Sequence, residues 1–131
     1  MRLLVDTHIV LWRQTGDRRL TQRTIDLMDD DANTVDVSAV SVWEVAVKHA
    51  LRQEGRIGLP LSGKQFLAEL RATGVIPLPI TPDHAAAVDD LPLHHRDPFD
   101  RLLIAQAACE GLVLLTHDAA LAAYGDRVIV V

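Results

Sequence analysis

The stretch DPFD, residues 97–100, places two carboxylates at the start of an apolar helical pattern. Asp97 occupies the position of a helix N-cap, and Pro98 follows at the first helical position, where its missing N–H costs no hydrogen bond. Asp100 then falls in the first turn, beside free backbone N–H groups and the positive end of the helix dipole. Capping alone would account for both carboxylates, and binding a cation is the alternative. The local pattern leaves both roles open.

Three further acids fall at comparable points of the chain. Asp6 follows the apolar run RLLV, and Asp118 stands two residues after the apolar run LVLLT. Each of these two could cap the helix that follows it. Glu44 is expected in the first turn of the helical stretch SVWEVAVKHALRQE, where Ser41 and Glu44 match the S-x-x-E capping box.

Short apolar runs alternate with helical patterns along the whole chain, and these elements must position the acids. Strands are predicted at residues 2–6, 34–39, 112–116 and 127–131, with an edge strand or extended segment at 75–80. Helices are predicted at residues 7–14, 21–30, 41–54, 63–73, 82–91, 98–110 and 117–124. The expected N-caps of three of them are Thr21, Ser62 and Thr81. This alternation predicts a three-layer α/β/α domain with a mainly parallel central sheet, and residues 1–131 suit a single domain.

In such a sheet the carboxyl ends of the strands and the starts of the following helices share one edge. Ligands bind at this edge, where the strand order reverses. We therefore expect acids that are distant in the sequence to converge there. Several carboxylates at close quarters repel one another unless a cation joins them, and oxygen-rich clusters suit Mg²⁺ or Mn²⁺. Such an ion can activate a water molecule for attack on a phosphodiester.

The composition limits the class of protein. The 131 residues are 49% hydrophobic, which is enough for a buried core, and the formal net charge of −5 argues against an openly basic nucleic-acid binder. A cluster of acids in one cleft would still leave basic patches elsewhere. Cys109 is the only cysteine, so a disulfide framework is excluded and a reducing compartment is expected. The N-terminus lacks a signal-peptide core, and no apolar run could span a bilayer, which predicts a soluble, cytoplasmic protein.

Four stretches carry a resemblance to a known family. LLVDTH, SAVSVWEVAVKHALRQEGRIGLP, HHRDPFDRLLIAQA and LLTHDAAL closely resemble the PIN-domain ribonucleases, in particular the VapC toxins of bacterial toxin–antitoxin modules. The resemblance covers essentially the whole chain, and the motifs stand in the family's order. It implies a parallel sheet with Asp6 at its centre, an acidic pocket that binds Mg²⁺ or Mn²⁺, and metal-dependent endonucleolytic cleavage of RNA.

The resemblance also implies roles for the acids. Asp6, Glu44 and Asp100 match the family's three principal acids, and Asp118 matches its more variable fourth position. In the resulting hypothesis Asp6 and Asp100 hold the principal metal ion. Glu44 completes its shell or orients the attacking water, and Asp118 supports a second ion or ordered waters. No serine triad or reactive cysteine setting is present, which fits water as the nucleophile.

Smaller contributions to the same pocket are implied for three more residues. Asp97 matches a frequent aspartate of this subgroup, and Thr7 and Thr116 match small polar residues that line the pocket. We expect Asp97 to act mainly as the helix cap, with a minor share in the pocket. We expect Asp100 to point into the cleft as a ligand.

Other charged or polar residues near these motifs have less specific interpretations. His94 and His95 could be metal ligands, but a solvated loop is the expected place for both, because an all-oxygen site needs no imidazole. For His117, contact with substrate and a structural role are both open. Arg101 could meet RNA phosphates or pair with a cleft acid, and Lys48 stands one helical turn after Glu44, the spacing of an i,i+4 ion pair.

The partners follow from the resemblance, and the alternatives from the motifs. The expected partners are an RNA substrate (transfer, ribosomal or messenger RNA), a VapB-type antitoxin that inserts a peptide into the cleft, and a second copy of the chain. A catalytically inert PIN-type binding module is the alternative, although no acid of the set is missing. A phosphoacceptor receiver domain would need adjacent acids after the first strand, and a dinucleotide-binding domain would need G-x-G-x-x-G there; neither is present.

Overall fold

A parallel sheet of four strands in the order β2-β1-β3-β4 forms the centre of the molecule. The computed structural model describes residues 1–131. The strands are short and consist of β1 (Arg2–Val5), β2 (Thr34–Val37), β3 (Val113–Thr116) and β4 (Val128–Val130). Their order reverses between β1 and β3, so the switch point of the sheet lies where these two strands end.

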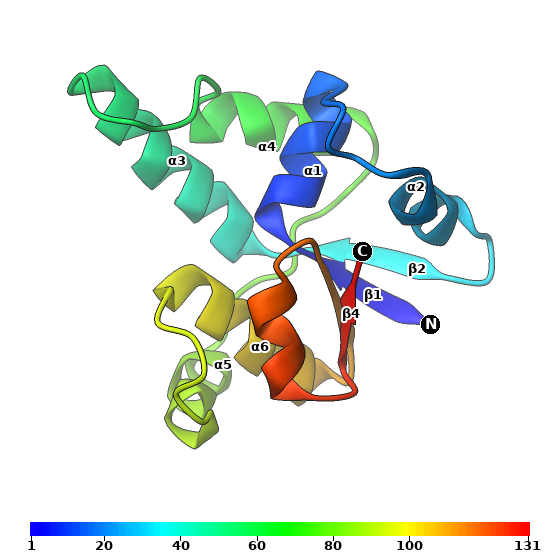
Figure 1. Ribbon diagram of the computed structural model, residues 1–131. Helices are drawn as coiled ribbons and strands as arrows, with labels where there is room; N and C mark the ends of the chain where they lie inside the picture. Colours follow the sequence, from blue (N-terminus) through cyan, green and yellow to red (C-terminus); the bar gives the residue numbers. More distant parts are fainter.

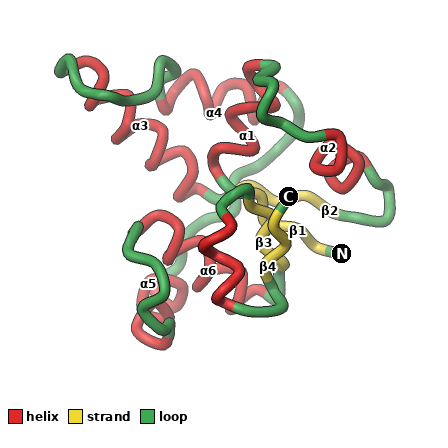
Figure 2. Tube along the Cα trace, viewed as in Figure 1, coloured by secondary structure: helices red, strands yellow, loops and turns green.

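Helices cover both faces of the sheet (Figures 1 and 2). Those on one side are α1 (Thr7–Thr15), α2 (Gln22–Asp29), α3 (Ala39–Gln53) and α4 (Gly63–Ala72). The other side carries α5 (Pro82–Ala87), the 3₁₀ turn η1 (Val88–Asp90), α6 (Pro98–Glu110) and the 3₁₀ segment η2 (Ala119–Tyr124). This arrangement confirms the predicted α/β class with helices on both faces of a parallel sheet.

The central strand β1 contributes side chains to both hydrophobic cores, one on each face of the sheet. Leu3 and Val5 pack into the core beneath α1 and α4, whereas Leu4 packs into the core beneath α6. All three side chains are fully buried. Successive side chains of a strand point to opposite faces, so a strand covered on both faces must be apolar at every position. This requirement explains the uninterrupted apolar run Leu3–Val5 before Asp6, whereas Arg2 at the start of the strand is exposed.

Most helix starts agree with the sequence, because their caps form as predicted. Thr21, Ser62, Thr81 and Asp97 each accept a hydrogen bond from the backbone of the first turn that follows. Residues 75–80 are extended, with one isolated bridge between Leu78 and Ser38. The predicted helix at the C-terminal end is a 3₁₀ segment.

The start of α3 was predicted wrongly. The helix begins at Ala39, because the Ser38 hydroxyl accepts the backbone N–H of Val40 and acts as the N-cap. Ala39 also donates its N–H to the Leu78 carbonyl, which fixes the chain at the point where β2 ends. Glu44 therefore lies in the second turn of α3 and not in the first. None of the helices has both the length and the apolar composition needed to cross a membrane.

Candidate active site

A polar cleft of about 210 Å³ lies at the switch point of the sheet. No hydrophobic side chain lines it. The structure brings together here all five acids that the sequence singled out, although they come from segments far apart in the chain. The lining residues are Asp6, His8, Glu44, Lys48, His95, Asp97, Asp100, His117 and Asp118.

Asp6 is buried in the cleft and held by hydrogen bonds from three residues. Its Oδ1 accepts the Ile9 N–H at 3.0 Å and so caps α1, while its Oδ2 accepts the Thr116 hydroxyl at 2.5 Å and the His117 N–H at 3.3 Å. Burial alone would raise the pKa of Asp6, but the hydrogen bond from the His117 ring, whose Nδ1 lies 3.3 Å from Oδ2, and those from Thr116 and Ile9 outweigh it and hold the pKa below its usual value. This carboxylate is charged at neutral pH.

Glu44 reaches the cleft from the second turn of α3 and is almost completely buried. Lys48 donates to its Oε2 at 2.5 Å, which confirms the expected i,i+4 pair. Its Oε1 is buried with no hydrogen-bond partner. Because Ser38 caps α3, the capping interpretation of Glu44 is wrong. An unpartnered carboxylate oxygen in a polar cleft points instead to a ligand at this place.

The two aspartates of DPFD have different roles: one caps α6 and the other faces the cleft. Asp97 Oδ1 accepts the Asp100 N–H at 3.0 Å and caps α6, as expected. The Asp100 carboxylate faces the cleft, where its Oδ2 accepts a hydrogen bond from His95 Nε2 at 2.8 Å. Burial and the negative charge of Asp97 raise the pKa of Asp100 to about 6, against the opposing effect of the His95 hydrogen bond.

Asp118 completes the acidic group from the segment after β3. Its Oδ1 accepts the Ala120 N–H at 3.0 Å and caps η2. Its Oδ2 lies 3.8 Å from His95 Nε2. One ligand atom from each of His95, Asp100 and Asp118 can be chosen so that all three lie within 4.8 Å of one another.

His95 therefore belongs to the cleft, and its prediction as a solvated loop residue was wrong. Arg101 provides the physical reason, because its guanidinium donates to the carbonyls of Pro92 and His95 and to the Tyr124 hydroxyl. These bonds fold the loop back over the start of α6. Arg101 does not pair with a cleft acid. His94 is exposed, with its ring against Tyr124.

Two more histidines flank the acids. The His117 ring packs against Trp12 at 4.5 Å between centroids, and its hydrogen bond with Asp6 raises the pKa of His117. His8 lies in the first turn of α1, and burial together with the charge of Lys48 lowers the pKa of His8. Sequence reasoning missed His8, although its position two residues after Asp6 was a usable signal.

The two threonines expected in the pocket lie behind its surface. Thr116 is fully buried and reaches the cleft only through its hydrogen bond to Asp6. Thr7 is also buried, and its hydroxyl donates to the Ser41 hydroxyl at 2.9 Å, which links α1 to α3. Both residues hold the elements that carry the acids.

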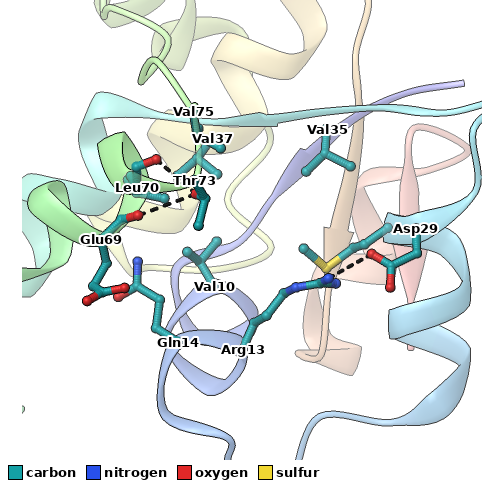
Figure 3. A pocket seen from close by; sticks show the side chains of 11 residues that line it. Val10, Arg13, Gln14, Asp29, Val35, Val37, Glu69, Leu70, Thr73 and Val75 are labelled. Atoms are coloured by element: carbon teal, nitrogen blue, oxygen red, sulfur yellow. Dashed lines mark hydrogen bonds and ion pairs between the residues drawn. The ribbon is translucent and has the colours of Figure 1, made fainter.

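A larger cavity of about 440 Å³ lies away from these groups, between α1, α2, β2 and α4 (Figure 3). Its walls are mostly aliphatic. Arg13 and Asp29 on its rim form an ion pair at 2.7 Å, and Thr73 donates to the carbonyl of Leu70. Gln14 on the same wall has a buried Oε1 without a hydrogen-bond partner. The acidic cleft is still the stronger candidate for chemistry, because carboxylates from separate segments converge there and no hydrophobic side chain lines it.

Comparison with known proteins agrees with this geometry. A family model of the PIN domain matches residues 3–127. The chain belongs to the PIN-domain family. PIN domains are generally nucleases.

Among solved structures, VapBC2 from Rickettsia felis, determined bound to a DNA fragment from their promoter, shares the fold. The TM-score is 0.67 at 13% sequence identity, over 100% of this chain and 98% of the other. Comparison with curated proteins gives no match.

Proposed function

We propose that the chain is a metal-dependent endoribonuclease, and that it is the toxin of a VapBC-type toxin–antitoxin pair. One observation carries the proposal: acids from four separate segments meet in a single polar cleft, and one of them, Glu44, has a buried oxygen without a partner. Capping explains Asp97, and it explains one oxygen each of Asp6 and Asp118. It explains neither the carboxylate of Asp100 nor that of Glu44.

The residues present fit a divalent cation. Carboxylate oxygens are the ligands that Mg²⁺ and Mn²⁺ prefer, and the cleft offers them from Asp6, Glu44, Asp100 and Asp118. Asp6 and Asp100 would hold the principal ion, Glu44 would complete its shell or orient a water, and Asp118 would support a second ion or ordered waters. A bound ion would make the water more nucleophilic and offset the charge of the phosphodiester under attack.

Side chains of the protein itself hold the acids of this site in position and affect their charge. Asp6 is kept charged and fixed by hydrogen bonds from three residues, so it can bind a cation without reorganising. The pKa of Asp100 is raised first by burial and then by the negative charges of Asp97, Glu44 and Asp6. A cation at this place would favour the charged form of Asp100. Lys48 balances the charge of Glu44 in the metal-free chain.

The partners belong to the same proposal. The proposed substrate is RNA, which the enzyme cuts at internal phosphodiester bonds. Residues 1–131 act as a single PIN domain, and the proposed location is the cytoplasm. A VapB-type antitoxin fits the acidic cleft, because a basic peptide segment would complement its charge. A homodimer is the proposed assembly. The structural similarity to a VapBC protein favours this context over other uses of the PIN fold.

The test is cleavage of a mixture of transfer and ribosomal RNA by the purified chain, freed of any antitoxin. The reaction is run with Mg²⁺, with Mn²⁺ and with EDTA. We expect discrete fragments that need the metal and that disappear in Asp6→Asn and Asp100→Asn. Asp31→Asn is the matched control, because Asp31 is exposed in the loop before β2, at the end of the strand away from the cleft.

Each failure has a distinct meaning. Fragments that persist in EDTA would contradict the metal mechanism, and normal cleavage by Asp100→Asn would return that residue to a structural role. A chain that binds RNA and metal but cleaves none of the RNAs would favour the inert binding module instead.

A further inference from the structure

We propose that His95 supplies a nitrogen ligand to the metal ion, so that the cleft is a mixed nitrogen–oxygen site that prefers first-row transition ions such as Mn²⁺ or Co²⁺ to Mg²⁺. This inference rests on the proposed function, because it requires the cleft to bind a divalent ion. It goes beyond that function by assigning a donor that an all-carboxylate site lacks, and with it a metal preference.

The position of the His95 ring fits a ligand. Its Nε2 lies 2.8 Å from Asp100 Oδ2 and 3.8 Å from Asp118 Oδ2. Adjacent ligand atoms of a six-coordinate ion stand about 3 Å apart, since each bond is about 2.1 Å long and adjacent bonds meet near a right angle. The three groups are therefore close enough to share one ion after small side-chain adjustments. A neutral imidazole carries its proton on either nitrogen, so Nε2 can bind a cation when the proton is on Nδ1.

The backbone that carries the His95 ring is also held, both at its N–H and at its carbonyl. The His95 N–H donates to the Tyr124 hydroxyl at 3.1 Å, and Arg101 donates to the His95 carbonyl at 3.4 Å. Arg101 bonds the same hydroxyl at 3.1 Å, so α6 and η2 together fix this loop residue. A metal ligand needs such support, because a loosely held donor loses affinity.

A second observation points to a ligand in the same cleft. Glu44 is buried and its Oε1 has no partner, although it lines the cleft with Asp100 and His95. A buried carboxylate oxygen is costly without a partner. A cation bound in the cleft would supply that partner.

The competing explanation is that His95 only orients Asp100 through a hydrogen bond. The two roles differ in chemistry. Carboxylate and water suit Mg²⁺, whereas an imidazole nitrogen strengthens binding of later first-row ions much more than of Mg²⁺. A residue that only orients Asp100 would be replaceable by another hydrogen-bond donor and would place no nitrogen on the ion.

The experiment is pulsed electron paramagnetic resonance of the whole chain loaded with Mn²⁺, which detects nitrogen nuclei bonded to the ion without any need for catalysis. We expect nitrogen modulation in the native chain and in the control His94→Ala, whose side chain is exposed beside the loop. The modulation should disappear in His95→Ala. It should also disappear in His95→Gln, which keeps a donor for Asp100 but has no imidazole.

Calorimetric affinities for Co²⁺ and Mg²⁺ give a second readout on the same variants. We expect His95→Gln to weaken Co²⁺ binding on the order of tenfold or more, and Mg²⁺ binding by much less. Circular dichroism of each variant verifies that it is folded.

The outcomes separate this inference from the proposed function. Mn²⁺ binding without nitrogen modulation would overturn the role of His95 and leave the carboxylate site intact. Modulation that survives in His95→Ala but disappears in His117→Ala would overturn it equally. A native chain that binds no divalent ion at all would overturn both proposals.

Discussion

Asp6 and Asp100 show how the same side chain acquires opposite properties within one cleft. Asp6 is the more buried of the two, yet hydrogen bonds from the His117 ring, Thr116 and Ile9 hold its pKa below the usual value. Burial and the charge of Asp97 raise the pKa of Asp100 to about 6, against the single opposing hydrogen bond from His95. The cleft thus contains one acid whose pKa lies below its usual value and another whose pKa lies near 6.

This difference predicts a pH-dependent effect of Asp100→Asn on stability. Folding raises the pKa of Asp100 from its ordinary 3.8 to about 6, so the folded chain binds the proton more tightly than the unfolded chain does. Asp100 therefore lowers the free energy of unfolding as pH rises through this window. In EDTA, we expect Asp100→Asn to be stabilised relative to the native chain by up to about 3 kcal/mol at pH above 7, since each pKa unit corresponds to about 1.4 kcal/mol.

Urea unfolding of both proteins near pH 4 and above pH 7 measures this effect. The difference in unfolding free energy should be small at the lower pH and large at the higher. An equal difference at both values would show that the pKa of Asp100 is not raised in the folded chain. Asp31→Asn, at an exposed position, should show no such pH dependence.

Lys48 leads to a second prediction at this scale. Its ammonium group is the only hydrogen-bond partner of the Glu44 side chain. Lys48→Met leaves the buried carboxylate unpaired, which should lower the free energy of unfolding without added metal by about 1–3 kcal/mol.

The same variant lacks the ammonium group that neutralises Glu44, so Mn²⁺ should stabilise the variant more than the native chain. Thermal unfolding with and without Mn²⁺ measures both effects, with Lys64→Met on the exposed face of α4 as the control. If Mn²⁺ raised the unfolding temperature of Lys48→Met and of the native chain equally, Lys48 would not be the group that neutralises Glu44.

At the scale of elements, the helix starts do most of the positioning. The N-terminus of α6 carries its cap and its cleft residue on separate side chains, Asp97 and Asp100. We expect Asp97→Ala to lose about 1 kcal/mol of stability, because the cap is lost. Asp97→Ser should recover most of this loss, since serine also caps. Chemical unfolding of the two variants tests the assignment, and an equal loss in both would contradict it.

The sequence predicted these elements well where the signal was local. Caps such as Thr21, Ser62 and Thr81 were identified from residue type and spacing alone. The start of α3 was missed because Ser38 and Ser41 are both suitable caps, and the choice depends on the contact of Ala39 with Leu78, far along the chain. The position of His95 was missed for a similar reason. The sequence of a loop has no periodicity that predicts its path, and hydrogen bonds from Arg101 to the carbonyls of Pro92 and His95 fix the path of this loop.

At the scale of the whole molecule, the parallel topology gathers the acids. Asp6 and Thr116 are 110 residues apart in sequence, yet they share a hydrogen bond because β1 and β3 are neighbours in the sheet. The alternation of strands and helices was sufficient to predict this convergence, although not the individual distances. A chain with a net charge of −5 thereby concentrates acids where a cation can neutralise them.

This concentration predicts that divalent ions stabilise the entire fold. An ion that binds only the folded chain adds about 2.7 kcal/mol when its concentration is one hundred times its dissociation constant. Thermal unfolding should therefore shift upwards with Mn²⁺ and return with excess EDTA. Asp6→Asn should remove most of the shift. A shift that is unchanged in Asp6→Asn would place the ion elsewhere in the molecule.

The rate of RNA cleavage at saturating Mn²⁺ is the sharpest test of a shared metal site in this cleft. Native chain, Asp100→Asn and Asp31→Asn are compared on the same RNA, each freed of antitoxin and each verified as folded. We expect Asp31→Asn to cleave at the native rate and Asp100→Asn to be slower by about a hundredfold or more. Equal rates for the native chain and Asp100→Asn would contradict the proposal that these acids act together on RNA.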